Sequence, residues 1–418
     1  MDKFLALSVL LLQFCFSSSL TIPAATNNIL INHAISSSNY DHPRKHDLHR
    51  KIKTRRAKLT SFEGVTAEIE NVEGTYLVNL VIGTPPVSFL ASPTTVTDLI
   101  WTQCKPCKHC FNQSTPIYNR SKSSSFSKLP CSHELCKASY IHSCNSDCRY
   151  KQKYLGGSSE GVMGTETITF GSHSVPDIAF GCGNSNTFVV SHGSGVLGLG
   201  RGPQSLVSQL GIRRFSYCLP YYAESNGRLL LGSEVQHQQN SKTEIQSTPL
   251  VLNPSNSSFY YLTLHGITVG ETKLQIPKGM FEVRKDGGGG LIINSGEMLT
   301  AMEQPAFGLL KDEFKSQLKL PFADKKSSLG YDACFSFEPK SNVEVPKLIY
   351  HFDRFADLVL PVENYVFTDS ENGVMCLAIL EGNEGVSTFG GIHQSNINMM
   401  FDLNKGELSF APVHCKEL

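Results

Sequence analysis

The sequence lacks three features that would each point to a particular class of protein. Positive charge shows no excess, because 37 Lys and Arg residues balance 37 Asp and Glu residues, and the chain offers no broad basic surface for nucleic acid. No apolar run reaches the roughly 18 residues that a transmembrane helix needs. The 14 histidines form no motif of the H-E-x-x-H type, and we expect neither a metal ion nor another cofactor.

Two glycine-rich segments resemble nucleotide-binding loops only in part. Residues 193–198 fit G-x-G-x-x-G, but they lack the strand-then-helix context and the acidic residue about 20 positions later that a dinucleotide site needs. The glycine run at 287–290 is not followed by Lys and Ser or Thr, so we interpret it as a hairpin loop.

The first residues are typical of a secretory signal peptide. Lys3 precedes a mostly apolar stretch at 4–16 and small residues at 17–19, which predicts a signal peptide over 1–19, with a signal anchor as the alternative. Residues 20–70 are polar and basic. We interpret them as a propeptide-like leader whose charge screens an acidic body, although a solvated leader has the same composition. The expected destination is the secretory route, ending outside the cell (the apoplast) or in the vacuole.

Thirteen cysteines are present, and Cys15 falls in the signal peptide. The other twelve are an even number in an exported protein, which indicates a disulfide framework. Cys104, Cys107 and Cys110 also have the spacing of zinc ligands, but export argues against that interpretation. The disulfide candidates are Cys104, Cys107, Cys110, Cys131, Cys136, Cys144, Cys148, Cys182, Cys218, Cys334, Cys376 and Cys415.

Three asparagines lie in N-glycosylation motifs, which is consistent with export. They are Asn112, Asn119 and Asn256, each followed two residues later by Ser. Asn253 is excluded because Pro254 follows it. The sequence therefore predicts a secreted glycoprotein.

From residue 75 onward the sequence is typical of a β protein. Short segments rich in strand-forming residues end at Gly- and Pro-containing turns. The best helical signals are at 205–210 and 304–318, where Phe307, Leu310 and Phe314 keep helical spacing. The predicted strands are 76–82, 165–170, 228–231, 259–269, 290–293, 357–360 and 407–410.

The two halves of the chain resemble each other weakly. Each has an apolar strand that enters a turn of small residues, at 90–97 and at 291–297, and a later apolar-Gly element, at 196–200 and at 388–392. This repetition predicts two similar β lobes that face one another across a cleft. The predicted units are an N-terminal lobe at 71–245, with a Cys-rich insertion at 104–148, and a C-terminal lobe at 246–418.

Several strings occur in an order and spacing that are specific to one family. They are Ile82-Gly-Thr-Pro-Pro86, Asp98-Leu-Ile-Trp-Thr-Gln-Cys104-Lys-Pro-Cys107, Gly198-Leu-Gly-Arg-Gly-Pro-Gln-Ser-Leu206, Phe215-Ser-Tyr-Cys218-Leu, Val345-Pro-Lys-Leu and Phe401-Asp-Leu-Asn-Lys-Gly-Glu-Leu-Ser-Phe-Ala-Pro412. Over residues 75–418 the chain resembles the pepsin-type aspartic proteases (peptidase family A1), and most closely the plant nepenthesin-like branch. The resemblance implies a mostly β, bilobal pepsin-like acid protease fold, with two six-stranded-type β-barrel lobes around a central cleft, and we expect a monomer.

The family's cysteine framework gives all twelve cysteines a partner. The pairs that the resemblance implies are Cys104–Cys107, Cys110–Cys182, Cys131–Cys148, Cys136–Cys144, Cys218–Cys415 and Cys334–Cys376. The sequence itself does not determine the connectivity.

Catalysis in this family requires two aspartates that share a proton, because two close carboxylates cannot both ionise easily. One accepts a proton from the attacking water, and the other polarises the scissile carbonyl. The resemblance places Thr94 and Asn294 at these two positions. Neither a threonine hydroxyl nor an asparagine amide serves as a base near neutral or acidic pH, so no catalytic aspartate is intact.

The rest of the two Asp-Thr/Ser-Gly turns is partly kept. Thr95 and Ser295 supply the hydroxyl that ties the turns together in the family, and Gly296 matches the family glycine. Val96 stands where the first turn has a glycine, and a β-branched residue suits such a backbone poorly. Glu297 replaces a threonine.

Three other residues are assessed as parts of the site. Asp98 matches an aspartate that active relatives also have, and we expect a structural role. Glu297 is a carboxylate that could project near the cleft, but it lacks a partner. Tyr154 matches the tyrosine of the flap, the hairpin that closes over bound peptide, although an edge hairpin with one buried tyrosine would look the same.

Three interpretations of function remain. The first is a non-catalytic relative that binds a peptide or protein in the cleft, or a foreign glycanase, since some plant members of this fold inhibit microbial cell-wall-degrading enzymes. The second is an active aspartic endopeptidase with an unusual site. The third is a drifted gene copy with a fold and no selected role.

Overall fold

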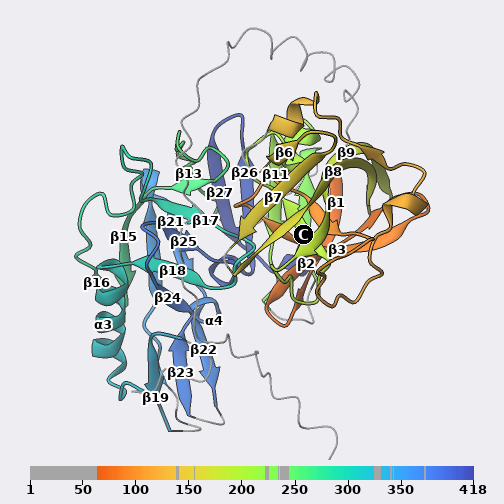
Figure 1. Cartoon of the computed structure of the whole chain (residues 1–418). Helices are drawn as coiled ribbons and strands as arrows, with labels where there is room; N and C mark the ends of the chain where they lie inside the picture. Colours follow the sequence, from red (N-terminus) through yellow and green to blue (C-terminus); the bar gives the residue numbers. More distant parts are fainter. Residues whose placement is uncertain are drawn as a thin grey trace, which may run out of the picture.

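The computed structural model describes residues 64–418 apart from 138–140, 155, 222–225, 234, 236–243, 324–330, 339–340, 342 and 371–372. The predicted signal peptide and most of the predicted leader lie outside these residues. The described chain is mostly β and bilobal, as predicted. Figure 1 shows one lobe coloured orange to green and a second coloured teal to blue, with the blue strands β26 and β27 beside the first lobe.

The largest sheet holds 15 strands and spans both halves of the chain. Its N-terminal members are β1 (Val65–Val72), β2 (Thr75–Ile82), β3 (Val87–Thr94), β4 (Trp101–Gln103), β5 (Ser127–Lys128), β6 (Ile141–Cys144), β7 (Cys148–Tyr154), β8 (Gly157–Phe170), β9 (His173–Asn186), β10 (Gly195–Gly198), β11 (Arg214–Cys218) and β12 (Gly227–Leu231). The C-terminal half adds β13 (Gln246–Pro249), β26 (Ile397–Asp402) and β27 (Glu407–Pro412) at one edge. The order β13-β27-β26-β11-β12-β1, called the shared sheet below, therefore joins the two halves by backbone hydrogen bonds.

Three smaller sheets make up the rest of the C-terminal lobe. The first holds β14 (Tyr261–Leu262), β17 (Leu291–Ile293), β25 (Ser387–Phe389), β18 (Thr300–Glu303) and β24 (Ile379–Gly382). The second holds β16 (Thr272–Lys273), β15 (Leu264–Val269), β20 (Leu348–Phe352) and β21 (Asp357–Leu360). The third holds β19 (Cys334–Ser336), β23 (Val374–Leu377) and β22 (Val366–Asp369).

All seven predicted strands overlap strands of the structure, and the segment predicted at 259–269 divides into β14 and β15. Both predicted helices are present as α2 (Leu206–Gln209) and α3 (Ala306–Leu318); a further short helix, α4 (Val362–Tyr365), precedes β22. The Ser205 side chain accepts from the Ser208 N–H and so caps α2. Phe307, Leu310 and Phe314 are fully buried on one face of α3, as their spacing predicts.

The leader was predicted to reach residue 70, but the folded lobe begins earlier. β1 pairs with both β12 and β2. Val65, Ala67 and Ile69 are buried while Glu68 and Glu70 are exposed, which is the two-residue alternation of a strand with one buried face. Composition alone hid this strand because its two glutamates resemble the polar leader before it.

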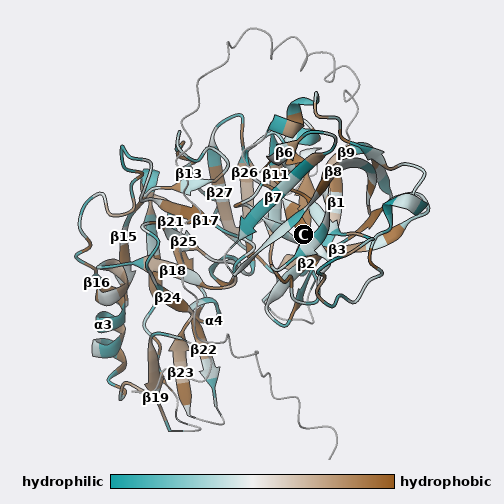
Figure 2. Cartoon of the chain, in the orientation of Figure 1, coloured by the Kyte–Doolittle hydropathy of each residue, from teal (hydrophilic) through white to brown (hydrophobic). Residues whose placement is uncertain are grey.

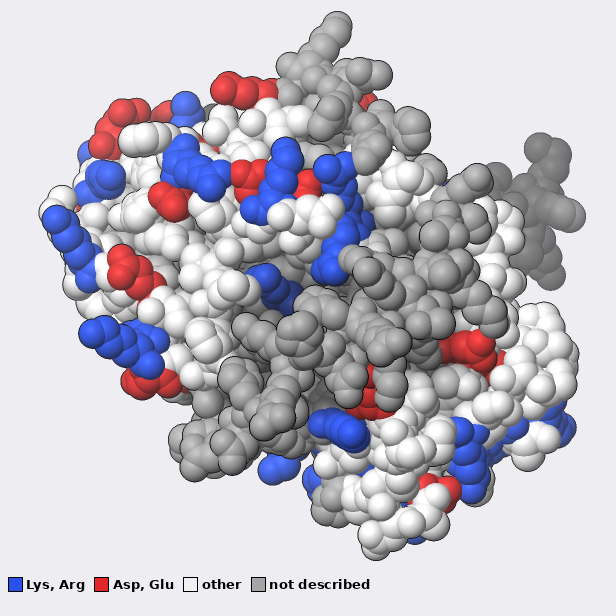
Figure 3. Space-filling model, turned by 90° about the horizontal axis from the view of Figure 1, so that it is seen from above, with Lys and Arg blue, Asp and Glu red and all other residues white. Residues whose placement is uncertain are grey.

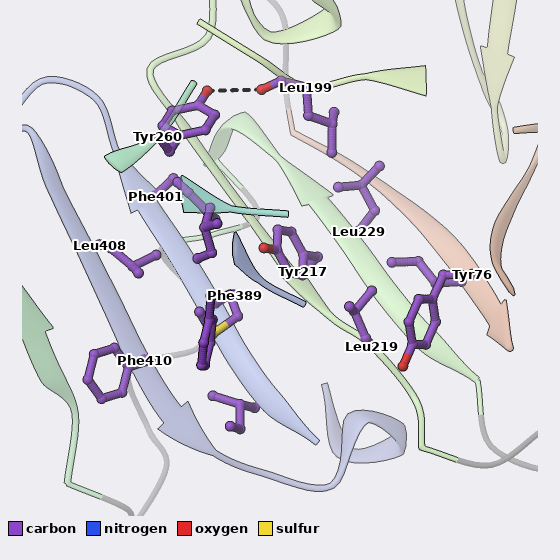
Figure 4. Close-up of a cluster of buried hydrophobic side chains, with 14 of the residues drawn as sticks. Tyr76, Leu199, Tyr217, Leu219, Leu229, Tyr260, Phe389, Phe401, Leu408 and Phe410 are labelled. Atoms are coloured by element: carbon purple, nitrogen blue, oxygen red, sulfur yellow. Dashed lines mark hydrogen bonds between the residues drawn. The ribbon is translucent and has the colours of Figure 1, made fainter. Parts of the chain in front are cut away.

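The shared sheet carries the apolar core at the junction of the lobes. Figure 4 shows Tyr217 and Tyr260 beside Phe401 there, with the Tyr260 hydroxyl donating to the Leu199 carbonyl oxygen at 2.9 Å. Figure 2 shows hydrophobic strands inside each lobe and hydrophilic segments outside, as along the outer side of α3. Core continuity across the junction makes the two lobes one packing unit.

All twelve candidate cysteines form disulfides, but four of the six implied pairings are wrong. The chain pairs Cys104–Cys182, Cys107–Cys110, Cys131–Cys144, Cys136–Cys148, Cys218–Cys415 and Cys334–Cys376. Cys104 follows β4, which runs parallel to β9, so that its N–H bonds to the Gly183 carbonyl and its sulfur meets Cys182. In the insertion, the β6–β7 hairpin sets Cys144 opposite Cys148, and each then reaches a different cysteine of the preceding loop.

Candidate functional site

The two predicted small-residue turns follow equivalent strands in the two lobes. β3 ends at Thr94 and pairs in parallel with β10, while β17 ends just before Asn294 and pairs in parallel with β25. The entering strands and the apolar-Gly elements of the sequence repeat are therefore direct neighbours in each lobe. Residues 94–97 and 294–297 are called the paired turns below.

Thr94 and Asn294 face each other at the centre of the paired turns. The Thr94 hydroxyl donates to Asn294 Oδ1 at 3.4 Å, and the two residues are only 6% and 8% exposed. Asn294 Oδ1 also accepts from the Gly296 N–H at 3.1 Å. Two uncharged side chains thus form a direct hydrogen bond at the place where aspartic-protease catalysis requires two carboxylates that share a proton.

The hydroxyls of Thr95 and Ser295 tie the turns together. Thr95 Oγ1 donates to the Ile293 carbonyl oxygen at 2.6 Å, and Ser295 Oγ donates to the Pro93 carbonyl oxygen at 3.0 Å. The Ser295 N–H also donates to Thr95 Oγ1 at 3.3 Å. Thr95 and Ser295 are buried. Each hydroxyl therefore supplies its carbonyl partner with a hydrogen bond in place of the one to water that the carbonyl loses on folding. The arrangement has the symmetry of the sequence repeat.

The glycine of the second turn is required by close approach. A Cβ at Gly296 would lie 2.6 Å from Thr94 Cβ, a distance that non-bonded carbons do not tolerate. Val96, at the matching place in the first turn, was expected to strain its backbone. The structure does not show that strain, because Val96 is not among the residues with positive φ.

Glu297 is held by the residue at the second aspartate position. Asn294 Nδ2 donates to Glu297 Oε2 at 3.1 Å. Burial, and next the negative charge of Glu384, raise the pKa of the Glu297 carboxyl to about 7, while the Asn294 hydrogen bond opposes that shift. The carboxyl therefore titrates near neutral pH, unlike an exposed glutamate.

Asp98 is committed to the packing between the lobes. Its Oδ1 accepts from the Gly202 N–H at 2.8 Å, and its Oδ2 accepts from the Ser258 hydroxyl at 2.7 Å. Burial raises the pKa of its carboxyl against the effect of these two bonds. Both oxygens are occupied by protein donors, which fits the structural role expected for Asp98.

Tyr154 ends β7, in the hairpin that β7 forms with β8. Its hydroxyl accepts a hydrogen bond from Trp101 Nε1 at 2.8 Å, and its ring stacks on Phe188 with centroids 4.3 Å apart. Burial raises the pKa of the Tyr154 phenol above its usual value. Gly156, two residues on, has a φ of +81°, a backbone conformation that its lack of a side chain permits.

The structure adds two residues that sequence reasoning missed. Gln394 donates to the Asn294 carbonyl oxygen at 3.3 Å and to that of Phe389 at 2.7 Å, and it accepts from the Tyr217 hydroxyl at 2.6 Å. His393 is fully buried, and its Nε2 has no hydrogen-bond partner among the described residues. Their only sequence signal is polarity directly after an apolar-Gly element.

The glycosylation candidates lie in three settings. Asn112 is exposed. Asn119 is half-buried and caps a short helical turn, since its Oδ1 accepts from the Ser121 N–H at 3.1 Å. Asn256 is half-buried in the loop before β14, and Ser258 of its motif is the residue bonded to Asp98.

Metal-ligating side chains come together at one place in the part of the chain that the structure describes. These are Cys131, Cys136 and Cys144, and each is in a disulfide, so none offers a thiolate ligand. No described helix is long and apolar enough to cross a membrane. On the face shown in Figure 3, acidic and basic side chains are interspersed outside the grey atoms.

Solved structures with a similar fold include edgp, with a TM-score of 0.69, 17% identity and coverage of 85% of this chain and 96% of that chain. The basic 7S globulin from soybean has a TM-score of 0.66 and 19% identity, and covers 84% of this chain and 97% of its own. These likenesses concern the fold.

Sequence relatives are much closer. Aspartic proteinases nepenthesin-1 and nepenthesin-2 of Nepenthes gracilis are 44% and 42% identical, each over 88% of this chain and 84% of the relative. Two family models match, one described as the xylanase inhibitor N-terminal domain over residues 76–233 and one as the C-terminal domain over 259–412. The chain therefore belongs to the nepenthesin-like plant aspartic proteases of the pepsin-type A1 family.

Proposed function

We propose that this protein is a secreted, non-catalytic member of its family that binds a peptide or protein between its lobes. The observation that carries the proposal is the direct hydrogen bond between Thr94 and Asn294 at the centre of the paired turns. A hydroxyl and an amide can hold a ligand but cannot activate water, because neither accepts a proton in the range where aspartates do.

The intact frame around these two residues favours binding over drift. Thr95 and Ser295 keep their bonds across the turns, and Gly296 keeps the close approach to Thr94. Asn294 and Glu297 form a matched donor and acceptor, so the two replacements compensate each other. A drifted copy would be expected to lose the bonds that tie the two turns together.

A foreign glycanase is a candidate partner of the same protein. The family models that match both halves carry the description of xylanase inhibitors, which names that kind of partner for other members. Export and glycosylation at Asn112, Asn119 and Asn256 belong to this proposal, since an inhibitor of a microbial enzyme acts outside the cell.

An active endopeptidase is the second candidate, and one observation favours it. The Glu297 carboxyl is hydrogen-bonded to Asn294, which stands at the second aspartate position. Its pKa of about 7 would allow it to act as a base near neutral pH. It still lacks the second acid that polarises the scissile carbonyl, which is why binding is the preferred function.

Incubation of the mature protein with denatured globin between about pH 3 and pH 7 separates the two candidates. A pepsin-type enzyme treated in parallel is the positive control. The binding protein should release no fragments above background, with or without pepstatin. Reproducible cleavage that pepstatin abolishes would contradict the proposal, and cleavage that Glu297→Gln abolishes would establish the second candidate.

A further inference from the structure

Glu297 has one carboxylate oxygen that the protein does not use. Oε2 accepts from Asn294 Nδ2, whereas Oε1 receives no hydrogen bond from the residues that the structure describes. The side chain is half-buried, and the Gly296 beside it is exposed. A polar atom in this position is accessible to a ligand that lies over the paired turns.

Two hydrogen bonds at the centre of the turns fix the amide that holds this carboxylate. The Thr94 hydroxyl and the Gly296 N–H both donate to Asn294 Oδ1, which fixes the amide so that its Nδ2 points to Glu297. The Glu297 side chain is therefore held in place before any ligand arrives, and the entropy cost of ordering it is already met on folding.

No ion pair among the described residues includes Glu297, and the charge that acts on its pKa is negative. Glu384, on the loop between β24 and β25, acts on it electrostatically. On β18, Glu303 accepts from the Glu384 N–H at 2.9 Å. From the N-terminal lobe, the Tyr76 ring lies against Gly391, which bonds to the Glu297 carbonyl oxygen.

The β1–β2 turn of the N-terminal lobe approaches Met298, the residue after Glu297. Met298 packs against Gly74 there, and the neighbouring Glu73 pairs with His192 at 2.9 Å. Burial raises the pKa of Tyr76 to about 12, so its phenol stays neutral. Of these groups, Glu384 acts on Glu297 as a second carboxylate, the Tyr76 phenol is neutral, and His192 is already paired with Glu73.

We propose that Glu297 is the specificity residue of the ligand site and selects a cationic group of a bound peptide or protein, such as a Lys or Arg side chain or a free N-terminus. The inference rests on the proposed function and names the ligand chemistry of that same site. A cation over Oε1 would be attracted by the Glu297 carboxylate, and it would offset the cost of burying the Glu297 charge.

Ionisation of Glu297 makes this recognition depend on pH. Because its pKa lies at about 7, the carboxyl is mostly neutral at acid pH and mostly charged above neutrality. Binding of a cationic ligand should therefore strengthen as pH rises through 7 and weaken as it falls. Neutral ligands should show no such dependence.

An array of immobilised hexapeptides tests the inference with the full-length protein. One position carries Lys, Arg, norleucine or Glu, and every peptide is made with a free and with an acetylated N-terminus. Wild type, Glu297→Gln and Glu363→Gln are applied at about pH 8 and about pH 5.5. Glu363 is an exposed residue of α4 and serves as the matched control, and glutamine at 297 keeps an acceptor for Asn294.

At about pH 8, wild type and Glu363→Gln should prefer cationic peptides over norleucine peptides by about tenfold. The preference should disappear at about pH 5.5 and in Glu297→Gln, which should still bind neutral peptides. If acetylation of the N-terminus abolishes binding of the cationic peptides, the N-terminus is the cation that Glu297 selects. If binding persists after acetylation, the cation is the Lys or Arg side chain. Peptide binding with no cationic preference, or a preference that survives Glu297→Gln, overturns this inference alone. Binding to no peptide overturns the peptide-binding function as well.

Discussion

The backbone N–H of Ser295, in the C-terminal lobe, donates to the hydroxyl oxygen of Thr95, in the N-terminal lobe, at 3.3 Å. The turn of the second lobe therefore holds the Thr95 hydroxyl in place. The two residues come from positions 200 apart in the sequence. Their contact joins the paired turns independently of the residues at Thr94 and Asn294.

Removing the hydroxyl at either position should destabilise the junction. Thr95→Val and Ser295→Ala each leave a buried carbonyl oxygen without its donor, at a cost of about 1–3 kcal/mol in the free energy of unfolding. Because the two share a network, the double variant should lose less than the sum of the single changes. Urea unfolding measures all three, with Thr368→Val on the exposed side of β22 as control. Strict additivity would contradict a shared network.

Restoring a catalytic pair should require a change at Glu297 as well as the family residues in the two turns. In a variant with Thr94→Asp, Val96→Gly and Asn294→Asp, the new carboxylate at the second turn would face Glu297 at about the 3.1 Å that Nδ2 now occupies. Two carboxylates at that distance compete for one proton and disturb the titration that catalysis needs. Addition of Glu297→Thr removes the competitor.

Pepstatin-sensitive cleavage of denatured globin at acid pH compares the threefold and fourfold variants. The fourfold variant should be the more active by at least about tenfold. Equal activities would show that Glu297 does not perturb the restored pair. If neither variant cleaves globin, the loss of catalysis has a further cause, in the flap hairpin or elsewhere.

His393 should make the fold sensitive to acid. Burial lowers the pKa of its imidazole from 6.5 to about 3, so between those values the unfolded chain binds a proton that the folded chain does not. Stability is then lost as pH falls from about 6.5, by at most about 1.4 kcal/mol per pH unit.

Unfolding free energies of wild type and His393→Gln, measured between about pH 7 and pH 4, test this dependence. The variant should show a shallower slope, whatever its stability at neutral pH. His173→Gln, at an exposed position in β9, should keep the wild-type slope. Equal slopes for wild type and His393→Gln would contradict the assignment.

Trp101 should report directly on the flap hairpin, because it is the only tryptophan in the sequence. Its indole is buried and donates to Tyr154. Tyr154→Phe removes that bond and should shift the emission to shorter wavelength, with a loss of about 1 kcal/mol in stability. A ligand that closes the hairpin should change the same emission in wild type. Unchanged emission in Tyr154→Phe would mean that the bond is not formed in solution.

Much of the fold follows from local pattern. Strands such as β2 and β21 were predictable because apolar residues recur at strand spacing between turns, and α3 because Phe307, Leu310 and Phe314 share a face. The two facing turns were predictable because the chain repeats one strand–turn unit in each half.

The errors came from relations that a linear pattern does not contain. Cysteines that lie a few residues apart can each pair with several partners at similar sequence separations. Only the register of β4 on β9 and of β6 on β7 determines which disulfides form. The strain expected at Val96 was inferred from a residue type, whereas the actual constraint is a contact made by Gly296 with the other lobe. The bond from Asn294 to Glu297 likewise depends on how the turn closes.

The shared sheet has a consequence for any attempt to divide the molecule. β11 pairs with β26 along five residues, and Cys218 is linked to Cys415. A protease that cuts between Val235 and Glu244 would therefore yield a nicked protein whose halves stay associated, even after reduction. Either half produced alone would expose a long unpaired strand edge and would be prone to aggregate, whereas the two halves produced together could reassemble.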